Sequence, residues 1–161
     1  MAAGATYEPI ATNTLGSATS SYTFSSIPGT YTDLVLIVYA KSANNDNLAI
    51  QVNSDTGTNY SNTYISGQSS TYQSGRNTSV NQAYITGIGT SFGTSIINLQ
   101  NYANTTTYKT FIGRGSWTDY QVRASSALWR STSAISSVTV LCTGDNFQTG
   151  STFTLYGIAA A

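Results

Sequence analysis

The tripeptide Asp55-Thr56-Gly57 matches the motif that holds the catalytic carboxylate of aspartic proteases. Such a site needs two carboxylates that share one proton, so a chain with a single copy could supply the second only by dimerising. In a protease, apolar strands fix this loop, whereas here the tripeptide lies within the polar segment NSDTGTN, residues 53–59. Asp and Asn side chains bond to their own backbone in turns, and glycine tolerates positive φ. The segment therefore predicts a hairpin turn between two strands.

Other catalytic chemistries lack the residues that they need. The chain has no histidine, so its Ser and Thr hydroxyls have no ordinary base, and a Ser-Lys pair could draw only on Lys41 or Lys109. Zinc, copper and iron sites need clusters of His or thiolate. Asp46 among its neighbouring Asn residues could contact Ca²⁺, but one carboxylate seldom binds Ca²⁺ tightly, so a polar turn is favoured. We therefore expect no enzyme activity, no metal and no cofactor.

Aromatic side chains are the remaining candidates for a binding site, because the chain has 12 Tyr and 2 Trp. Rings beside Asn, Asp and Gln side chains suit sugar recognition, although strands and subunit interfaces favour aromatic residues as well. Trp129 has arginines near it in the sequence, so a cation–π contact or an interface anchor competes with simple core packing, which is favoured. The candidate interface residues are Tyr60, Tyr64, Tyr72, Trp117, Tyr120, Trp129 and Arg130.

The charge of the chain argues against two classes of partner. Charged residues make up 7% of the 161 residues, and six basic side chains cancel six acidic ones. Such a surface attracts neither nucleic acid nor anionic lipid, and its weak self-repulsion suits a subunit of an assembly. The longest apolar run, LVLIVYA, is far shorter than the roughly 20 residues of a membrane helix, and the N-terminus has no signal-peptide pattern. We expect no nucleic-acid partner, no membrane partner and synthesis in the cytoplasm.

The elements that must position these residues are β-strands. Apolar residues alternate with polar ones at Leu48, Ile50 and Val52, and again at Phe153 and Leu155. The run DLVLIVYAKS is apolar on both faces, which predicts a central strand covered on both sides. The single cysteine, Cys142, lies in the apolar run VTVLC and is expected in the core. Further strands are expected at residues 7–14, 63–66, 82–88, 95–102, 107–116 and 125–131, the last of which would also tolerate a helical turn.

Short strands separated by Gly, Ser and Asn turns indicate an all-β fold, an antiparallel β-sandwich of jelly-roll-like type. A chain of 161 residues is long enough for one domain with its own core. We place this sandwich domain at residues 22–161. Residues 1–21 are polar and precede it as an N-terminal arm.

Three motifs follow one another in the second half of the chain: NYANTTTYKTFIGRG, LWRSTSAISSVTV and GDNFQTGSTFTLYGI. Together with the upstream segment YTFSSIPGTYTDLVLIVYAKS, their order resembles the β-sandwich module of tailed-phage virion proteins, from about Tyr22 onward. The positions that carry this resemblance are Trp129, Ala134, Ile135, Val138, Val140, Phe147, Gly150, Ser151, Phe153, Leu155, Tyr156, Gly157 and Ile158.

The resemblance implies a structural or binding role in a phage head or tail and supplies no active-site residue. Because the chain is one module without a shaft, we expect a capsid decoration or cement protein on the outer head surface of the virion. It would bind the major capsid protein as a homo-oligomer, expected to be a trimer, with residues 1–21 as an attachment arm that could be deleted without unfolding the sandwich. The alternative is a receptor- or glycan-binding module of a tail fibre, which would contact a host-surface glycan. A hydrolase is the third and least favoured class, because histidine is absent.

Overall fold

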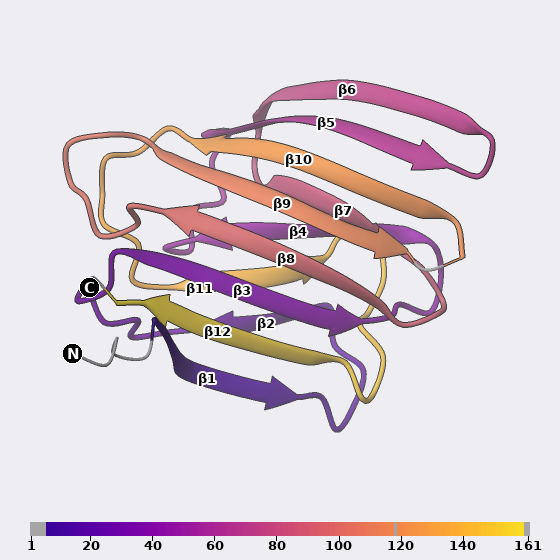
Figure 1. Ribbon diagram of the computed structural model, residues 1–161, viewed down its shortest axis with the longest axis horizontal. Coiled ribbons are helices and arrows are strands. Elements are labelled where there is room, and N and C mark those ends of the chain that lie inside the picture. The colour runs from indigo at the N-terminus through magenta and orange to yellow at the C-terminus, as the bar shows by residue number, and fades with distance from the viewer. Residues whose placement is uncertain (1–5, 118, 160–161) are drawn as a thin grey trace.

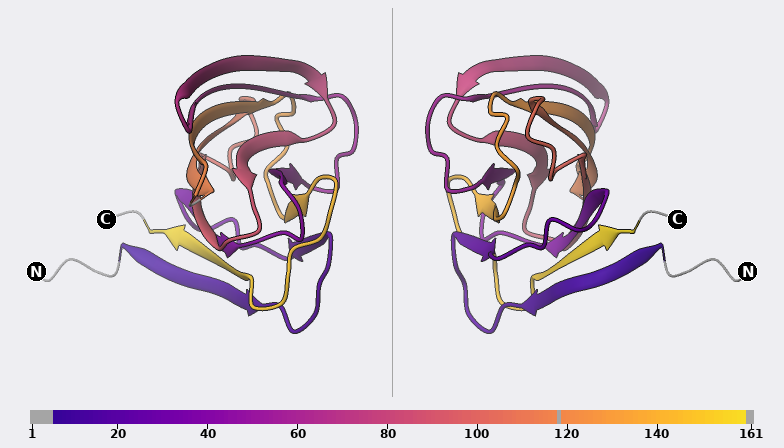
Figure 2. Two further views of the ribbon diagram at one scale, coloured as in Figure 1. Left: turned by 90° about the vertical axis from the view of Figure 1, so that its right-hand side faces the viewer. Right: turned by 90° about the vertical axis from the view of Figure 1, so that its left-hand side faces the viewer.

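The computed structural model describes residues 6–117 and 119–159, which form two antiparallel β-sheets packed face to face (Figures 1 and 2). One sheet has eight strands and the other has four. No helix occurs within these two ranges, so none of the described segments is a helix that could span a bilayer. The predicted all-β antiparallel sandwich is confirmed.

The chain passes back and forth between the two sheets, as it does in jelly rolls, and every neighbouring pair of strands is antiparallel. In spatial order the large sheet contains β1 (Tyr7–Thr14), β12 (Thr152–Ile158), β3 (Asp33–Ala40), β8 (Gly93–Gln100), β9 (Lys109–Trp117), β10 (Gln121–Trp129), β5 (Tyr60–Gln68) and β6 (Thr71–Val80). The small sheet contains β2 (Ser21–Phe24), β11 (Val138–Cys142), β4 (Asp46–Val52) and β7 (Ala83–Ile88).

Alternating side chains from both sheets fill a single core. On β12, Phe153 and Leu155 are fully buried, while the residues between them face outward. The Phe153 ring stacks on Tyr22 of β2 at 5.6 Å between ring centroids and meets the edge of Phe147 at 5.0 Å. Cys142 is buried in the same core, as predicted. The period-two pattern therefore produces the contact between the sheets directly.

The small sheet covers only one face of the apolar strand β3. β3 lies inside the large sheet between β12 and β8, and Leu34 and Leu36 are completely buried in the core. On the opposite face, Tyr39 remains 49% exposed. Val35 on that face is nevertheless buried, so the prediction of cover on both sides holds for only part of the strand.

The described part of the predicted arm is a strand of the sandwich. β1 pairs with β12 along its length, with Tyr7 opposite Ile158 and Thr14 opposite Thr152. Residues 1–5 of the arm lie outside the described residues. Deleting residues 1–21 would therefore remove the edge strand β1, which the prediction had placed in an arm outside the sandwich.

Three local predictions differ in outcome. The segment 125–131 is a strand through Trp129, as expected, since it continues β10. The turn at residues 53–59 joins β4 to β5, which belong to different sheets, so it is a crossing turn and not a hairpin. β6 was missed, because its sequence TYQSGRNTSV has no apolar alternation; it is an exposed edge strand held by β5 alone.

The β5–β6 end of the large sheet extends past the small sheet. β7, the edge strand of the small sheet, packs under β9, β10 and β5. In Figure 2, β5 and β6 form the top of the molecule, above β7. Four strands thus leave part of the inner face of eight strands without an apolar cover, and the candidate site lies there.

We predict that Phe153→Ala lowers the free energy of unfolding by about 3–5 kcal/mol, because it removes a fully buried ring and leaves a cavity. Chemical denaturation followed by tryptophan fluorescence measures this loss. The matched control is Tyr156→Ala on the outward face of the same strand, for which we expect about 1 kcal/mol. Equal losses for both variants would contradict the described orientation of β12.

Candidate functional site

The seven predicted interface residues do not form one surface. Tyr60 and Trp129 are buried in the core, where their rings stack at 6.5 Å. The predicted core packing of Trp129 is confirmed, and neither residue can serve as an interface contact in this fold. Arg130 lies at the end of β10, where its Nη1 donates to Ser61 Oγ at 2.7 Å. These three residues fasten β10 to the start of β5.

Asp55 joins the crossing turn to the core. Its carboxylate accepts hydrogen bonds from Trp129 Nε1 at 2.6 Å, the Gly57 backbone N–H at 2.8 Å and Asn59 Nδ2 at 2.9 Å. Burial raises the pKa of Asp55, but these hydrogen bonds outweigh burial, and the net pKa lies below its ordinary value. A protease dyad raises one carboxyl pKa so that a proton can be shared. The Asp55 carboxylate thus has the environment of a structural turn.

The outward face of the large sheet carries an apolar surface. Tyr72 is 93% exposed, and Ile65, Val122 and Ile112 are 66%, 68% and 54% exposed. We call these four residues the outer patch. They come from four neighbouring strands, β6, β5, β10 and β9, and Arg114 lies among them opposite Ala124. A shallow hollow of about 490 Å³ lies between Tyr72, Ile65, Val122 and Arg114.

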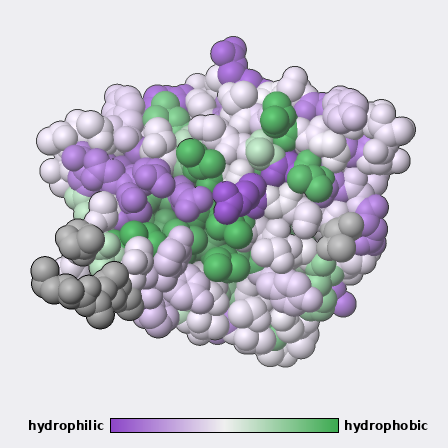
Figure 3. Space-filling model, in the orientation of Figure 1, coloured by the Kyte–Doolittle hydropathy of each residue, from purple (hydrophilic) through white to green (hydrophobic). Residues whose placement is uncertain are grey.

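Figure 3 views the large sheet from outside and shows separate apolar side chains among polar ones, with the largest apolar group near the middle of the face. Large apolar groups exposed together often mark an interaction surface. The sequence analysis singled out only Tyr72 of the outer patch, because Ile65 and Ile112 fall in strands expected to bury their apolar residues and Val122 falls between two expected strands. In these strands polar residues alternate with the patch residues. Because the polar residues occupy the inward face, the apolar ones must point outward.

The inner face of the same strands is polar. Beneath β5 and β6 is a hollow of about 280 Å³, which we call the polar hollow. Its lining residues are Asn45, Asp46, Asn47, Tyr64, Gln68, Gln73, Gly87, Trp117, Gln121 and Arg123. It brings together Tyr64 and Trp117 from the predicted set, and Tyr120 packs on Trp117 with 4.7 Å between ring centroids. Tyr72 faces the other side of the sheet.

Arg123 is the central charge of the polar hollow. It is only 7% exposed, and its guanidinium carbon lies 3.6 Å from the centroid of the Tyr64 ring. Its Nη1 donates one long hydrogen bond of 3.5 Å to Asn47 Oδ1, and its Nε has no partner among the described residues. Burial lowers the pKa of Arg123, and Tyr64 opposes that shift. Arginine nevertheless stays protonated at neutral pH.

Further buried polar groups lie beside Arg123. Ser66 is directly opposite Arg123 across the β5–β10 pair, and Ser125 is opposite Tyr64. Within residues 6–117 and 119–159, the hydroxyls of Ser66 and Ser125 have no hydrogen-bond partner, and neither does Asn62 Nδ2. Most buried polar atoms in folded proteins are paired, so these three unpaired groups are exceptions that lie near Arg123, although none of the three residues lines the polar hollow.

Glycines provide the room for these side chains. A Cβ on Gly75 of β6 would lie 2.7 Å from the Tyr64 hydroxyl oxygen, and a Cβ on Gly87 would lie 2.5 Å from Gln121 Oε1. The Gly87 backbone N–H donates to this Gln121 oxygen at 3.1 Å, which leaves the Gln121 amide NH₂ as a donor. The hollow is therefore shaped by backbone positions that a larger residue would fill.

The remaining candidate groups are used by the fold. Asp46 accepts from Thr143 Oγ1 at 2.7 Å and from Gly144 N at 2.5 Å; burial raises its pKa, but such hydrogen bonds outweigh burial and the net pKa is lowered. Cys142 Sγ donates to Asp46 at 3.2 Å, and burial raises the pKa of the thiol. No cluster of three His, Cys, Asp or Glu side chains suited to a metal occurs in the described ranges.

Among the described residues, neither lysine ammonium group contacts a serine hydroxyl. Lys109 Nζ donates to the backbone carbonyls of Thr107 at 2.8 Å and Thr132 at 3.2 Å, and burial lowers the pKa of Lys109. The Lys41 ammonium lies 5.0 Å from the centroid of the Phe92 ring. Both ammonium groups therefore contact elements of the fold.

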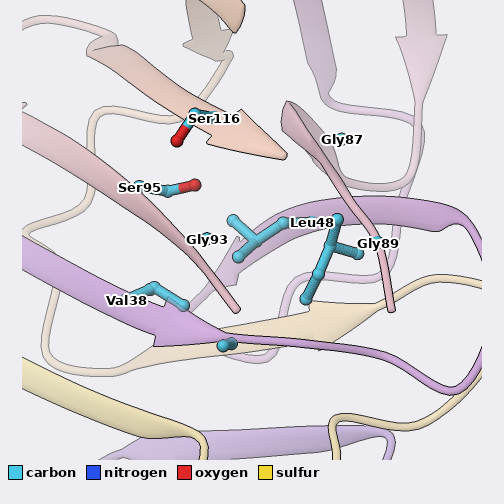
Figure 4. Close-up of a pocket in the computed structure, with 9 residues that line it drawn as sticks. Val38, Leu48, Gly87, Gly89, Gly93, Ser95 and Ser116 are labelled. Atoms are coloured by element: carbon cyan, nitrogen blue, oxygen red, sulfur yellow. The ribbon is translucent and has the colours of Figure 1, made fainter. Parts of the chain in front are cut away.

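Figure 4 shows the residues around a small pocket between the two sheets, among them Val38, Leu48 and Ser95. Its volume of about 10 Å³ is at the limit for a single water molecule. The two hollows at the β5–β6 end are therefore the stronger candidates for binding.

We predict that Asp55→Asn destabilises the protein at neutral pH by about 1 kcal/mol, because charged hydrogen bonds are lost from a half-exposed site. The folded pKa of Asp55 is lowered, so its stabilisation is present above the unfolded pKa of about 3.9 and disappears as the pH falls through the folded pKa. Denaturation curves from pH 7 to pH 3 should therefore converge for the variant and the parent protein. Asp119→Asn, which alters an exposed carboxylate bonded to Ser91, is the control and should change little. A constant difference at all pH values would contradict the prediction.

Comparison with known proteins gives no independent information on these two hollows. The chain matches no family model, and no curated protein is significantly similar to it. The features that bear on function are therefore the two hollows, the fold and the order of the sequence motifs.

Proposed function

We propose that this chain is a structural protein of a tailed-phage virion that binds the outer surface of the head as a decoration or cement protein. The single observation that carries the proposal is the outer patch of Ile65, Tyr72, Ile112 and Val122, whose large apolar side chains are more than half exposed. The confirmed sandwich fold agrees with the resemblance of its motifs to virion modules. The proposed partner of the outer patch is the major capsid protein.

Burial of the outer patch would supply the binding energy. Fully burying a Val, Ile or Phe-sized side chain contributes about 1.5–3 kcal/mol. The cost of removing charges from water is small here, since 7% of the residues are charged and none of the four patch residues is. Each copy would stabilise the shell by bridging neighbouring capsid subunits, since a ligand that binds only the assembled state shifts the equilibrium toward it. In this proposal the protein acts as a homotrimer.

The patch is also mechanically suited to repeated binding. Its residues stand on four hydrogen-bonded strands, so their spacing is fixed before contact and little conformational entropy is lost. β6, one of the two edge strands of the large sheet, is rich in polar residues, which disfavours uncontrolled pairing between copies. A fixed binding face and a polar edge strand favour binding of a defined number of copies to the capsid.

A receptor- or glycan-binding module of a tail fibre is the second candidate. The observation that favours it is the polar hollow, where Tyr64 and Trp117 lie beside amide side chains and a buried arginine. Aromatic rings and amides are the groups that commonly contact sugars. The two candidates use opposite faces of one sheet and can be tested separately.

The location of the protein distinguishes the two candidates. Purified virions would be separated into heads and tails, and copies of this chain quantified by mass spectrometry against the major capsid protein. We expect abundance in the head fraction comparable to that of the major capsid protein. A few copies confined to tails would overturn the cement proposal and favour the fibre module.

We predict that Ile65→Lys combined with Val122→Lys prevents attachment to heads, because burying two lysines in an apolar contact is unfavourable. Heads from a phage that lacks the gene would be incubated with purified protein, and occupancy measured after sedimentation. We expect at least about a tenfold loss of affinity, which corresponds to about 1.4 kcal/mol, with the melting temperature little changed.

The control is Thr58→Lys, which places a lysine in the exposed turn between β4 and β5 and should bind normally. Undiminished binding by the folded double variant would show that the outer patch is not the contact surface.

A further inference from the structure

We propose that the polar hollow binds a sugar unit that carries a carboxylate, with Arg123 as the partner of the acid group. The proposal concerns the inner face of the large sheet, so it does not depend on what the outer patch binds. Its basis is a buried, incompletely paired cation within a polar hollow that is open to solvent.

The charge of Arg123 has no carboxylate partner among the described residues. The guanidinium has five N–H donors, yet its contacts are the Tyr64 ring and one hydrogen bond of 3.5 Å to Asn47. Nε is buried without a partner. Arginine binds carboxylates through two parallel hydrogen bonds, and such bonds are strongest where water is excluded. The hollow therefore offers a preformed half of an arginine–carboxylate pair.

The other lining groups match sugar hydroxyls and sugar C–H faces. Gln68, Gln73 and Asn47 present amide groups, and the NH₂ of Gln121 remains available because its oxygen is held by Gly87. The Trp117 ring offers an apolar face beside them. A volume of about 280 Å³ suits a single ring better than an extended ligand. Mixed amide and aromatic lining thus favours a sugar over an aliphatic acid.

The single arginine favours a carboxylate over a phosphate. A phosphate monoester carries up to two negative charges, whereas Arg123 is the only basic residue among the described residues that line the hollow. Asp46 also lines it, and a second negative charge on the ligand would be repelled by this carboxylate. A hexuronic acid or a sialic acid has one charge and several hydroxyls, which fits the arrangement.

The test is a titration of the full-length protein with glucuronate, N-acetylneuraminate, glucose, acetate and inorganic phosphate. Protein-observed ¹H–¹⁵N NMR would follow the Trp117 indole and the Arg123 Nε–H signals at constant ionic strength. We expect saturable shifts with at least one of the two acidic sugars, with a Kd on the order of 1 mM. Glucose, acetate and phosphate should each bind at least about tenfold more weakly, since each lacks either the carboxylate or the hydroxyls.

Arg123→Gln should remove the preference for the acidic sugar over glucose. Arg114→Gln removes the same charge from the outward face of the neighbouring strand and should leave binding unchanged. If Arg123→Gln does not fold, Gln73→Ala on the exposed strand β6 provides a second variant, which should weaken binding of the acidic sugar about tenfold.

Four results would overturn the proposal: no saturable binding of either acidic sugar, equal binding of glucose, equal binding of acetate or phosphate, or full binding by folded Arg123→Gln. None of these results bears on head attachment, because that property is measured with the outer-patch variants. Likewise, loss of head attachment in the Ile65 and Val122 double variant would not alter the expected NMR shifts.

Discussion

Four strands cannot cover the inner face of eight, and this mismatch determines the arrangement of the molecule. The small sheet packs under the middle of the large one, where Phe153, Leu155 and Leu36 from the large sheet meet its apolar residues. At the β5–β6 end, β7 is the last strand that provides cover. Beyond it, the inward face of β5 and β10 borders the polar hollow, and the inward residues Ser66, Arg123 and Ser125 are buried although they are polar.

The same strands change character along their length. On β10, Trp129 and Ala127 are buried apolar residues of the core, whereas Ser125, Arg123 and Gln121 continue the same inward face as polar residues. β5 follows the same course, from Tyr60 in the core to Ser66 and Gln68. One pair of strands thus serves as core at one end and as the wall of a polar hollow at the other. The pairing of β5 with β10 runs without interruption from one end to the other.

This change explains which features the sequence could predict. β12, β11 and β4 were found because their alternation reflects burial along the whole strand, as Phe153 and Leu155 show. β6 was missed because neither face is buried, so its sequence has no apolar period. Tyr60 was expected only at an interface although it packs in the core, and the core packing favoured for Trp129 is held by a contact with Asp55 that spans 74 residues, which no local pattern reveals. The polar hollow has the same difficulty: Asn47, Tyr64 and Arg123 come from three strands of two sheets, and no local spacing connects them.

The opposite faces of β5 and β10 place the two candidate binding surfaces back to back. Val122 belongs to the outer patch and Arg123 to the polar hollow, and the neighbours Ile65 and Ser66 are divided between the two faces in the same way. Successive residues of a strand point to opposite sides of a sheet. A contact made through the outer patch would therefore leave the inner face uncovered, with its hollow open beside β7. The fold thus permits attachment and ligand binding at once, with a single layer of backbone between them.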